Sequence, residues 1–266
     1  MKLTIIGGGN MGSSIAKGLV SGNMYKAEDI TVVDIDEDVL KVLENALPGI
    51  NTADSDYKCI ETADVVILAV KPWLIEEVIL EIKPRLDYEK QILISIASGI
   101  TIEKMEKLLE KDSVEAPLPA LFRLIPNTAI AIQESLTLVA TGSYVEYRKE
   151  ELVMDMFDAL GKAILIDESK MQSCTALTSC GIAFLFRYIR AATLAGTEMG
   201  IPPKDAQEML AYTMKGAADL LLSTGANPED EIDKVTTPGG ITIKGINELE
   251  ANGFSNAIIK ALKACK

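Results

Sequence analysis

The chain has 266 residues, 48% of them apolar, which suits one large or two modest domains with a sizeable core. Its formal net charge of −13 argues against nucleic acid and anionic membranes as partners, and no apolar run reaches membrane-spanning length. The complete absence of histidine excludes Ser-His-Asp and Cys-His catalysis and any histidine-containing metal site.

The residues at 3–6 and 30–33 form two apolar strands, with a glycine turn and a helical segment between them. This order is typical of a dinucleotide-binding unit. Gly7 permits the tight turn, Gly9 lets a pyrophosphate approach the backbone, and Gly12 lets the helix pack closely on the strand. The free N–H groups at the helix start would face the phosphates. The turn therefore supplies the first group of expected cofactor-binding residues: Gly7, Gly9, Asn10, Met11 and Gly12.

Asp34 ends the second strand, where a carboxylate accepts hydrogen bonds from both hydroxyls of the adenine ribose. The same carboxylate would repel the 2′-phosphate of NADPH, and no arginine lies in residues 34–38 to bind one. The sequence therefore predicts NADH or NADPH as the cofactor, with NADH favoured by Asp34.

The next part of the chain alternates apolar runs with helical segments. Continuous apolar strands, unlike alternating ones, indicate a parallel sheet covered by helices on both faces. We therefore expect an α/β fold, a Rossmann-like doubly wound sheet over residues 1–167. The expected strands after the second are 64–70, 91–96, 122–125, 136–140 and 163–166, and the expected helices are 37–46, 74–83, 101–110 and about 147–160.

Three loops follow strands of this sheet, at the edge where doubly wound sheets bind ligands. Lys71 reaches the ribose or phosphates of the cofactor, or it is an ordinary surface lysine before a helix that begins at Pro72. The corner at 126–128 either faces the cofactor or is merely a turn. The candidate cofactor-binding residues from these loops are Ala69, Val70, Lys71, Pro72, Ala97, Ser98 and Asn127.

Strand patterns end near residue 167, and residues 168–266 are expected to form an all-α dimerisation and substrate-binding domain. It is either a self-packed bundle or a dimer whose helices cross between subunits. The long predicted helix at 170–199 favours the dimer. The other expected helices are 204–222, which begins at Pro202 and Pro203, and then 229–234, 242–251 and 255–264.

The segment 235–242 lies between two of these helices. Thr237 is placed as an N-cap and Pro238 as the first helical residue. Two adjacent glycines at a helix start each cost about 1 kcal/mol relative to alanine, and a simple cap does not explain them. Bare N–H groups and threonine hydroxyls instead suit a small carboxylate. The expected substrate-binding residues are Val235, Thr236, Thr237, Gly239, Gly240, Ile241 and Thr242.

Together these segments resemble the pyrroline-5-carboxylate reductase family, whose members catalyse the last step of proline synthesis. The resemblance covers nearly the whole chain and is most specific at 235–242, which is similar to the family's Val-Ser-Ser-Pro-Gly-Gly-Thr/Ala-Thr motif. The other matching segments are 6–12, 69–72, 125–128 and 249–254. The resemblance implies a Rossmann domain and a helical domain that is interleaved with that of a partner. It also implies homodimers, which in some members form decamers. The substrate would be pyrroline-5-carboxylate and the product L-proline.

The resemblance also implies a mechanism. Hydride would pass from C4 of the reduced nicotinamide to the imine carbon of the ring, C5 in proline numbering, while the residues at 236–240 hold the carboxylate. Thr242, the candidate catalytic residue, would hydrogen-bond near the ring nitrogen or the carboxylate. Because 236–242 contains no ionisable side chain, we expect catalysis mainly by orientation, with the iminium bound already protonated.

The chain departs from the family pattern at three places. The residues at 178–184 replace Ser-Gly-Ser-Gly-Pro-Ala-Tyr and lose two small polar residues and a proline, which leaves substrate fit and rate open. Ala129 ends the Pro-Asn-Thr-Pro corner, and Gly225 stands where some members have a glutamate. None of these changes removes the predicted anion pocket.

Two other functions remain open. A 3-hydroxyacid dehydrogenase-like reductase needs a lysine on the long helix followed four residues later by asparagine, and 175–199 contains neither. A non-enzymatic NAD-binding module would not need the 235–242 segment. No Asp-x-Asp-x-Asp-Gly calcium loop is present, so no metal is expected. The scattered cysteines indicate reduced thiols in a cytoplasmic protein: Cys59, Cys174, Cys180 and Cys265.

Overall fold

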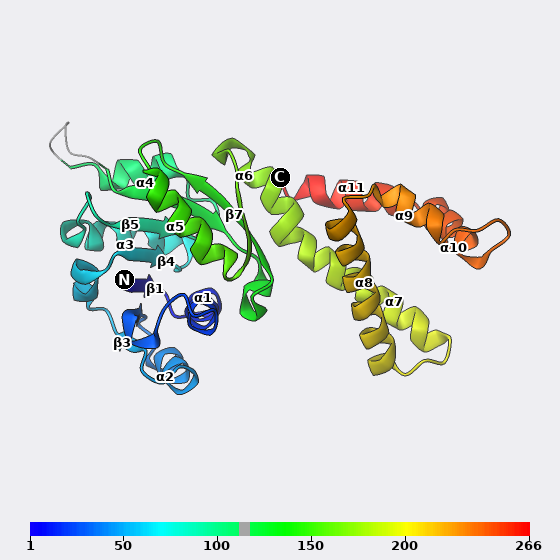
Figure 1. Cartoon of the computed structure of the whole chain (residues 1–266), viewed down its shortest axis with the longest axis horizontal. Helices are drawn as coiled ribbons and strands as arrows, with labels where there is room; N and C mark the ends of the chain where they lie inside the picture. Colours follow the sequence, from blue (N-terminus) through cyan, green and yellow to red (C-terminus); the bar gives the residue numbers. More distant parts are fainter. Residues whose placement is uncertain (112–117) are drawn as a thin grey trace. The chain divides into compact units, whose positions relative to one another are not determined.

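The computed structural model describes residues 1–111 and 118–266, which form two compact units, Met1–Ser179 and Cys180–Lys266. The first unit is built around one eight-stranded sheet with the strand order β3-β2-β1-β4-β5-β6-β7-β8 (Figure 1). The order reverses at β1, as in doubly wound folds. The strands are β1 (Leu3–Ile6), β2 (Ile30–Val33), β3 (Asn51–Ala53), β4 (Val65–Leu68), β5 (Ile92–Ser95), β6 (Ala120–Ile125), β7 (Ser135–Thr141) and β8 (Gly161–Leu165).

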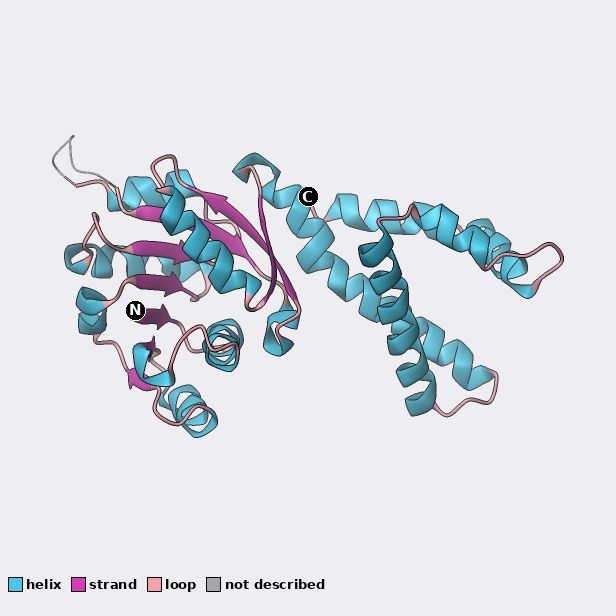
Figure 2. Ribbon diagram, viewed as in Figure 1, coloured by secondary structure: helices cyan, strands magenta, loops and turns pink. Residues whose placement is uncertain are grey.

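Helices cover both faces of this sheet, as its continuous apolar strands predict (Figure 2). Ile5 and Ile67 face the core that α1, α2 and α5 complete, whereas Ile6 and Leu68 face the core shared with α3, α4 and α6. The helices are α1 (Asn10–Ser21), α2 (Glu37–Ala46), α3 (Ile75–Ile82), α4 (Ile102–Leu109), α5 (Tyr147–Asp158) and α6 (Met171–Thr175). The predicted doubly wound α/β fold is confirmed.

The sheet is not parallel throughout. Strands β1 to β6 pair in parallel, but β7 runs antiparallel to β6, and β8 is parallel to β7. The short strand β3 was not predicted, because its three polar and small residues form no apolar run.

The second unit is entirely helical. Its helices are α7 (Gly181–Glu198), α8 (Pro203–Thr224), α9 (Pro228–Lys234), α10 (Ile241–Ala251) and α11 (Phe254–Ala264). Of residues 180–266, which are all described, the structure buries only Thr193, Gly196 and Ala206. Large apolar side chains remain exposed along its helices, including Leu185, Phe186, Tyr188, Leu194, Met209, Tyr212, Leu220, Phe254 and Ile259. A folded unit with so much uncovered apolar surface indicates a protein interface.

The first unit extends beyond residue 167, where its sheet ends. The side chain of Met171 is 1% exposed and belongs to the core of the α3 and α4 face. Residues 176–180 form a π turn between α6 and α7, so the long helix predicted at 170–199 is continuous but changes its winding there. By its contacts, the segment 168–179 belongs with the sheet, whereas we placed it in the helical domain from the sequence.

Candidate active site

The glycine turn joins β1 to α1 at the carboxyl edge of the sheet. Gly7 has a φ of +106°, and a Cβ atom there would lie 2.7 Å from the carbonyl group of Ala69. A Cβ atom on Gly12 would lie 1.9 Å from the carbonyl oxygen of Gly7, so the helix and the strand touch at this point. The tight turn predicted at Gly7 and the close packing predicted at Gly12 are both present.

Gly9 differs from its two neighbours in the motif. Its φ of −63° is open to any residue, and a Cβ atom would meet nothing within 4 Å. Neither backbone conformation nor packing within the protein therefore requires glycine here. The space left beside the N-terminus of α1 fits the close approach of a phosphate group to the backbone.

Asp34 follows β2 and lies beside the same turn. One carboxylate oxygen accepts a 2.6 Å hydrogen bond from the amide of Gly8, and the other accepts one of 3.0 Å from the amide of Asp36. These two bonds hold the carboxylate at the carboxyl edge of the sheet. Its remaining lone pairs suit ribose hydroxyl donors.

A cavity of about 330 Å³ opens next to Asp34, and we call it the Asp34 cavity. It brings together six of the predicted cofactor-binding residues: Gly7, Gly9, Asp34, Ala69, Val70 and Lys71. Its lining also contains residues that the sequence analysis missed, namely Ile6, Val33, Ile35, Asp54, Tyr57, Leu74, Glu77, Val78 and Glu81. Glu77 and Glu81 are one helical turn apart on α3, a spacing that a search for charged residues after the Lys71 loop could have found.

Tyr57 reports the electrostatics of this cavity. Its pKa is raised above the ordinary value by burial first, and then by the negative charges of Glu81, Glu77 and Asp34. Three carboxylates, two from α3 and one from the end of β2, therefore act on one phenol. The Asp34 cavity has a negative potential.

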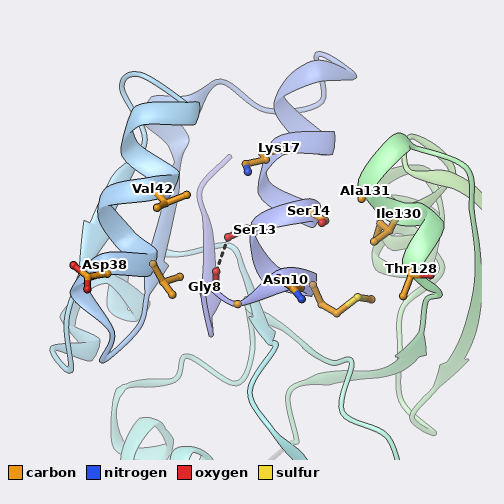
Figure 3. Close-up of a pocket in the computed structure, with 13 residues that line it drawn as sticks. Gly8, Asn10, Ser13, Ser14, Lys17, Asp38, Val42, Thr128, Ile130 and Ala131 are labelled. Carbon is orange, nitrogen blue, oxygen red and sulfur yellow. Dashed lines mark hydrogen bonds between the residues drawn. The ribbon is translucent and has the colours of Figure 1, made fainter.

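A second cavity of about 580 Å³ lies on the other side of the glycine turn, between α1, α2 and the 3-10 turn Thr128–Ile132 (Figure 3). The predicted residues Asn10 and Met11 line it, and Gly9 lines both cavities. Polar side chains from α1 complete it, including Ser13, Ser14 and Lys17. The two cavities therefore meet at Gly9, where a Cβ atom would contact no other atom of the protein.

The other predicted cofactor residues do not line either cavity. Pro72 begins a 3-10 turn directly after Lys71, as predicted, and Ala97 is buried while Ser98 is exposed. Asn127 has structural partners: its side-chain oxygen accepts from the amide of Ala129, and its side-chain nitrogen donates to the carbonyl of Thr178 over 3.4 Å. Asn127 therefore stabilises the turn at 126–129 and links it to Thr178. Its contact with a cofactor stays a prediction.

A buried ion pair anchors the segment that follows the sheet. Arg123 in β6 is 9% exposed and lies 2.9 Å from a carboxylate oxygen of Glu168, which also accepts from the amide of Ile102 at the start of α4. The Nε atom of Arg123 has no hydrogen-bond partner among the residues described. This pair was not predicted, because its members are far apart in the sequence.

The predicted substrate segment lies in the second unit, between α9 and α10. Contrary to the prediction, Thr237 is not the N-cap: α10 begins at Ile241, and Gly240 is the capping residue, without a side-chain cap. Gly239 has a φ of +73°, and the amide of Gly240 donates to the carbonyl of Thr237, so residues 237–240 form a turn before the helix. The left-handed residue explains why the helix cannot start at Pro238.

The open start of α10 keeps the features of an anion site. The first N–H groups of a helix have no intrahelical partner, and the side chain of Ile241 is 86% exposed beside them. Thr242 is half-buried in the first turn, whereas the hydroxyl of Thr236 is occupied by a 2.7 Å bond to the carbonyl of Ile232. Thr242 therefore remains the stronger hydroxyl candidate of the two.

Residues 1–111 and 118–266 contain neither a cluster of metal-ligating side chains nor a membrane-spanning helix. No cluster of three or more histidine, cysteine, aspartate or glutamate side chains in these ranges is arranged to hold a metal ion. No helix there is long and apolar enough to cross a membrane.

Two family models match the chain, and they divide it between them. Residues 2–99 match the model "NADP oxidoreductase coenzyme F420-dependent", and residues 168–266 match "Pyrroline-5-carboxylate reductase dimerisation". The second match begins where the sequence analysis placed the helical domain, whereas the compact first unit runs to Ser179.

Relatives and a solved structure match along the whole chain. Pyrroline-5-carboxylate reductase 1 of Dictyostelium discoideum is 37% identical, covering 98% of this chain, but this chain spans only about half (48%) of that protein. Pyrroline-5-carboxylate reductase 2 of the same organism is 36% identical over 98% of this chain and 89% of its own length. The crystal structure of Plasmodium falciparum pyrroline carboxylate reductase with NADP bound aligns over 100% of this chain and 95% of its own, with a TM-score of 0.87 and 26% identity.

Proposed function

Because the chain belongs to the pyrroline-5-carboxylate reductase family, we propose that its two units reduce 1-pyrroline-5-carboxylate to L-proline with the residues described above. The first unit is an NAD(P)-binding Rossmann domain, and the second is a dimerisation domain. One observation carries the residue-level proposal. The same chain combines a glycine turn with an unfilled Cβ position at Gly9 and a glycine-rich turn that leaves the start of α10 uncapped.

The cofactor fits the first unit. The adenine ribose would lie at Asp34, and the pyrophosphate would lie at Gly9, where the two cavities meet at the N-terminus of α1. Ala69, Val70 and Lys71 would line the adenosine end. When bound, the dihydronicotinamide would supply hydride to the imine carbon, which becomes C5 of proline.

The 235–242 segment would bind and orient the substrate. The N–H groups at the start of α10 would bind the substrate carboxylate, and the hydroxyl of Thr242 would donate to the carboxylate or the ring nitrogen. With no histidine in the chain and no ionisable side chain in this segment, these residues orient the substrate and move no proton. The iminium therefore binds with its proton already in place.

A steady-state assay tests this function. Purified protein is expected to oxidise NADH or NADPH in the presence of synthetic 1-pyrroline-5-carboxylate and to release L-proline. Loss of cofactor absorbance without proline formation would contradict the proposal.

We propose that NADH is preferred over NADPH because of Asp34. The double variant Asp34→Ser with Ile35→Arg removes the carboxylate that repels the 2′-phosphate and adds a cation at the next residue. The preference is expected to move toward NADPH by at least tenfold, about 1.4 kcal/mol, in ratios of kcat/KM. A wild-type enzyme that already prefers NADPH at saturating substrate would show that Asp34 has been misinterpreted.

We also propose that two copies of the chain form a homodimer through the helical unit, because that unit buries only three of its own residues. Light scattering at micromolar concentration is expected to show no monomer. A stable and fully active monomer would disprove the proposed interface, and a mass near ten chains would show that dimers assemble further, into decamers.

A further inference from the structure

We propose that Glu77 and Glu81 of α3, together with Asp54, act as a charge filter that excludes the 2′-phosphate of NADPH from the Asp34 cavity. This inference rests on the proposed NADH preference and extends it, because it assigns cofactor selection to residues outside the β2 end where Asp34 lies.

The charge of the cavity lining is the first observation. Its ionised side chains are four carboxylates, those of Asp34, Asp54, Glu77 and Glu81, and one ammonium group, that of Lys71, which gives a formal charge of −3. These groups come from different elements: the end of β2, the loop after β3, the loop after β4, and α3. A cavity of this charge suits a neutral diol better than a phosphate.

The missing counter-ions are the second observation. Within the described ranges, no cation lies within ion-pair distance of Asp54, Glu77 or Glu81, and none of their side chains has a hydrogen bond that would tie it up. The adjacent Glu76, by contrast, lies 3.5 Å from Lys104 and outside the cavity lining. The negative charge of these three residues is therefore offset by Lys71, solvent and salt, without a direct ion pair.

Tyr57 shows that these charges reach the interior of the cavity. It is one of the lining residues, and both Glu81 and Glu77 raise the pKa of its phenol, as does Asp34. A phosphate in the same space would meet the same repulsion at about twice the charge. A ribose hydroxyl carries no charge, so the filter disfavours NADPH more than NADH, whose charge lies on the pyrophosphate alone.

The test uses isosteric variants of the full-length enzyme. In the double variant Glu77→Gln with Glu81→Gln, the Kd of NADPH is expected to fall about tenfold at an ionic strength of about 0.01 M, where the screening length is about 30 Å. At about 1 M salt, where screening acts within about 3 Å, the gain is expected to shrink to less than twofold. The Kd of NADH, whose pyrophosphate is also charged, should fall by a smaller factor than that of NADPH at low salt and should change by less than twofold at high salt. Glu76→Gln, which removes the same charge from the same helix outside the cavity, should leave both affinities unchanged.

Three outcomes would overturn the charge filter and leave the proposed NADH preference intact. NADPH affinity unchanged in the double variant, while Asp34→Ser with Ile35→Arg still shifts the preference, would leave Asp34 as the selector and the NADH proposal intact. A gain that does not depend on salt would indicate shape instead of charge. An equal gain in Glu76→Gln would indicate a general surface effect. If the wild type prefers NADPH, the NADH preference and the filter both fail, because the cavity then does not exclude the 2′-phosphate.

Discussion

Replacing Thr242 by valine is expected to lower kcat/KM for 1-pyrroline-5-carboxylate by roughly 10- to 150-fold. Valine keeps the shape of the side chain and removes one hydrogen bond to a charged or polarised partner, a loss of roughly 1.5–3 kcal/mol. Thr242 is the second residue of α10, two positions after Gly240, the N-cap residue that has no side chain to cap the helix. The affinity for NADH, measured by fluorescence, should hardly change, because the other unit binds the cofactor.

Thr213→Val is the matched control for this change. Thr213 lies on α8, and its hydroxyl donates to the carbonyl of Met209, four residues earlier. The control removes a threonine hydroxyl from a helix of the same unit and should leave kinetics near normal. Unchanged efficiency in Thr242→Val would remove Thr242 from the site, and equal losses of efficiency and NADH affinity would indicate a folding defect.

Alanine at Gly9 and alanine at Gly12 are expected to have opposite effects. At Gly12 the new Cβ atom would collide with the backbone of Gly7, so the free energy of unfolding should fall by about 3 kcal/mol, as for severe overpacking. At Gly9 the atom meets nothing and φ is ordinary, so stability should be unchanged or rise by about 0.4–1 kcal/mol. Yet Gly9→Ala should weaken NADH binding by roughly tenfold or more, about 1.4 kcal/mol, because the methyl group takes the space of the pyrophosphate.

Two measurements separate these effects: urea denaturation of the protein without cofactor, and NADH titration followed by fluorescence. The pair is informative because both changes add one methyl group to the same turn. If Gly9→Ala binds NADH as tightly as the wild type, the pyrophosphate does not pass over Gly9. If Gly12→Ala is as stable as the wild type, the strand and helix can separate more easily than their contact indicates.

Most of the fold could be predicted because it depends on local patterns. The apolar runs that became β4 and β5 are buried on both faces, and such strands are recognisable without knowledge of their neighbours. The antiparallel direction of β7 could not be predicted, since a strand buried on both faces has the same pattern in either direction. The N-cap was wrongly assigned to Thr237 because Pro238 is well suited to a first helical turn, whereas the left-handed Gly239 delays the helix to Ile241, close to the start of the expected range 242–251.

The site residues that belong to one continuous sequence motif could be predicted. The residues that come from separate segments and meet only in the folded structure could not. The glycine turn and Asp34 follow a continuous motif, and the structure places them around one cavity. Asp54, Tyr57 and Glu77 come from separate elements, and none is part of a recognisable pattern by itself. Their shared position depends on the strand order, which brings β3 and β4 to either side of the β1–β2 pair.

The ion pair between Arg123 and Glu168 limits where the first unit could be separated from the rest of the chain. A protein that ended at residue 167, where the sheet is complete, would leave a buried guanidinium group without its carboxylate and the amide of Ile102 without its acceptor. Removing one member of such a pair costs about 3–5 kcal/mol. The transferable module for gene fusion or for exchange between enzymes is therefore 1–179. A recombination junction at the end of β8 would separate Glu168 from Arg123 and from the amide of Ile102.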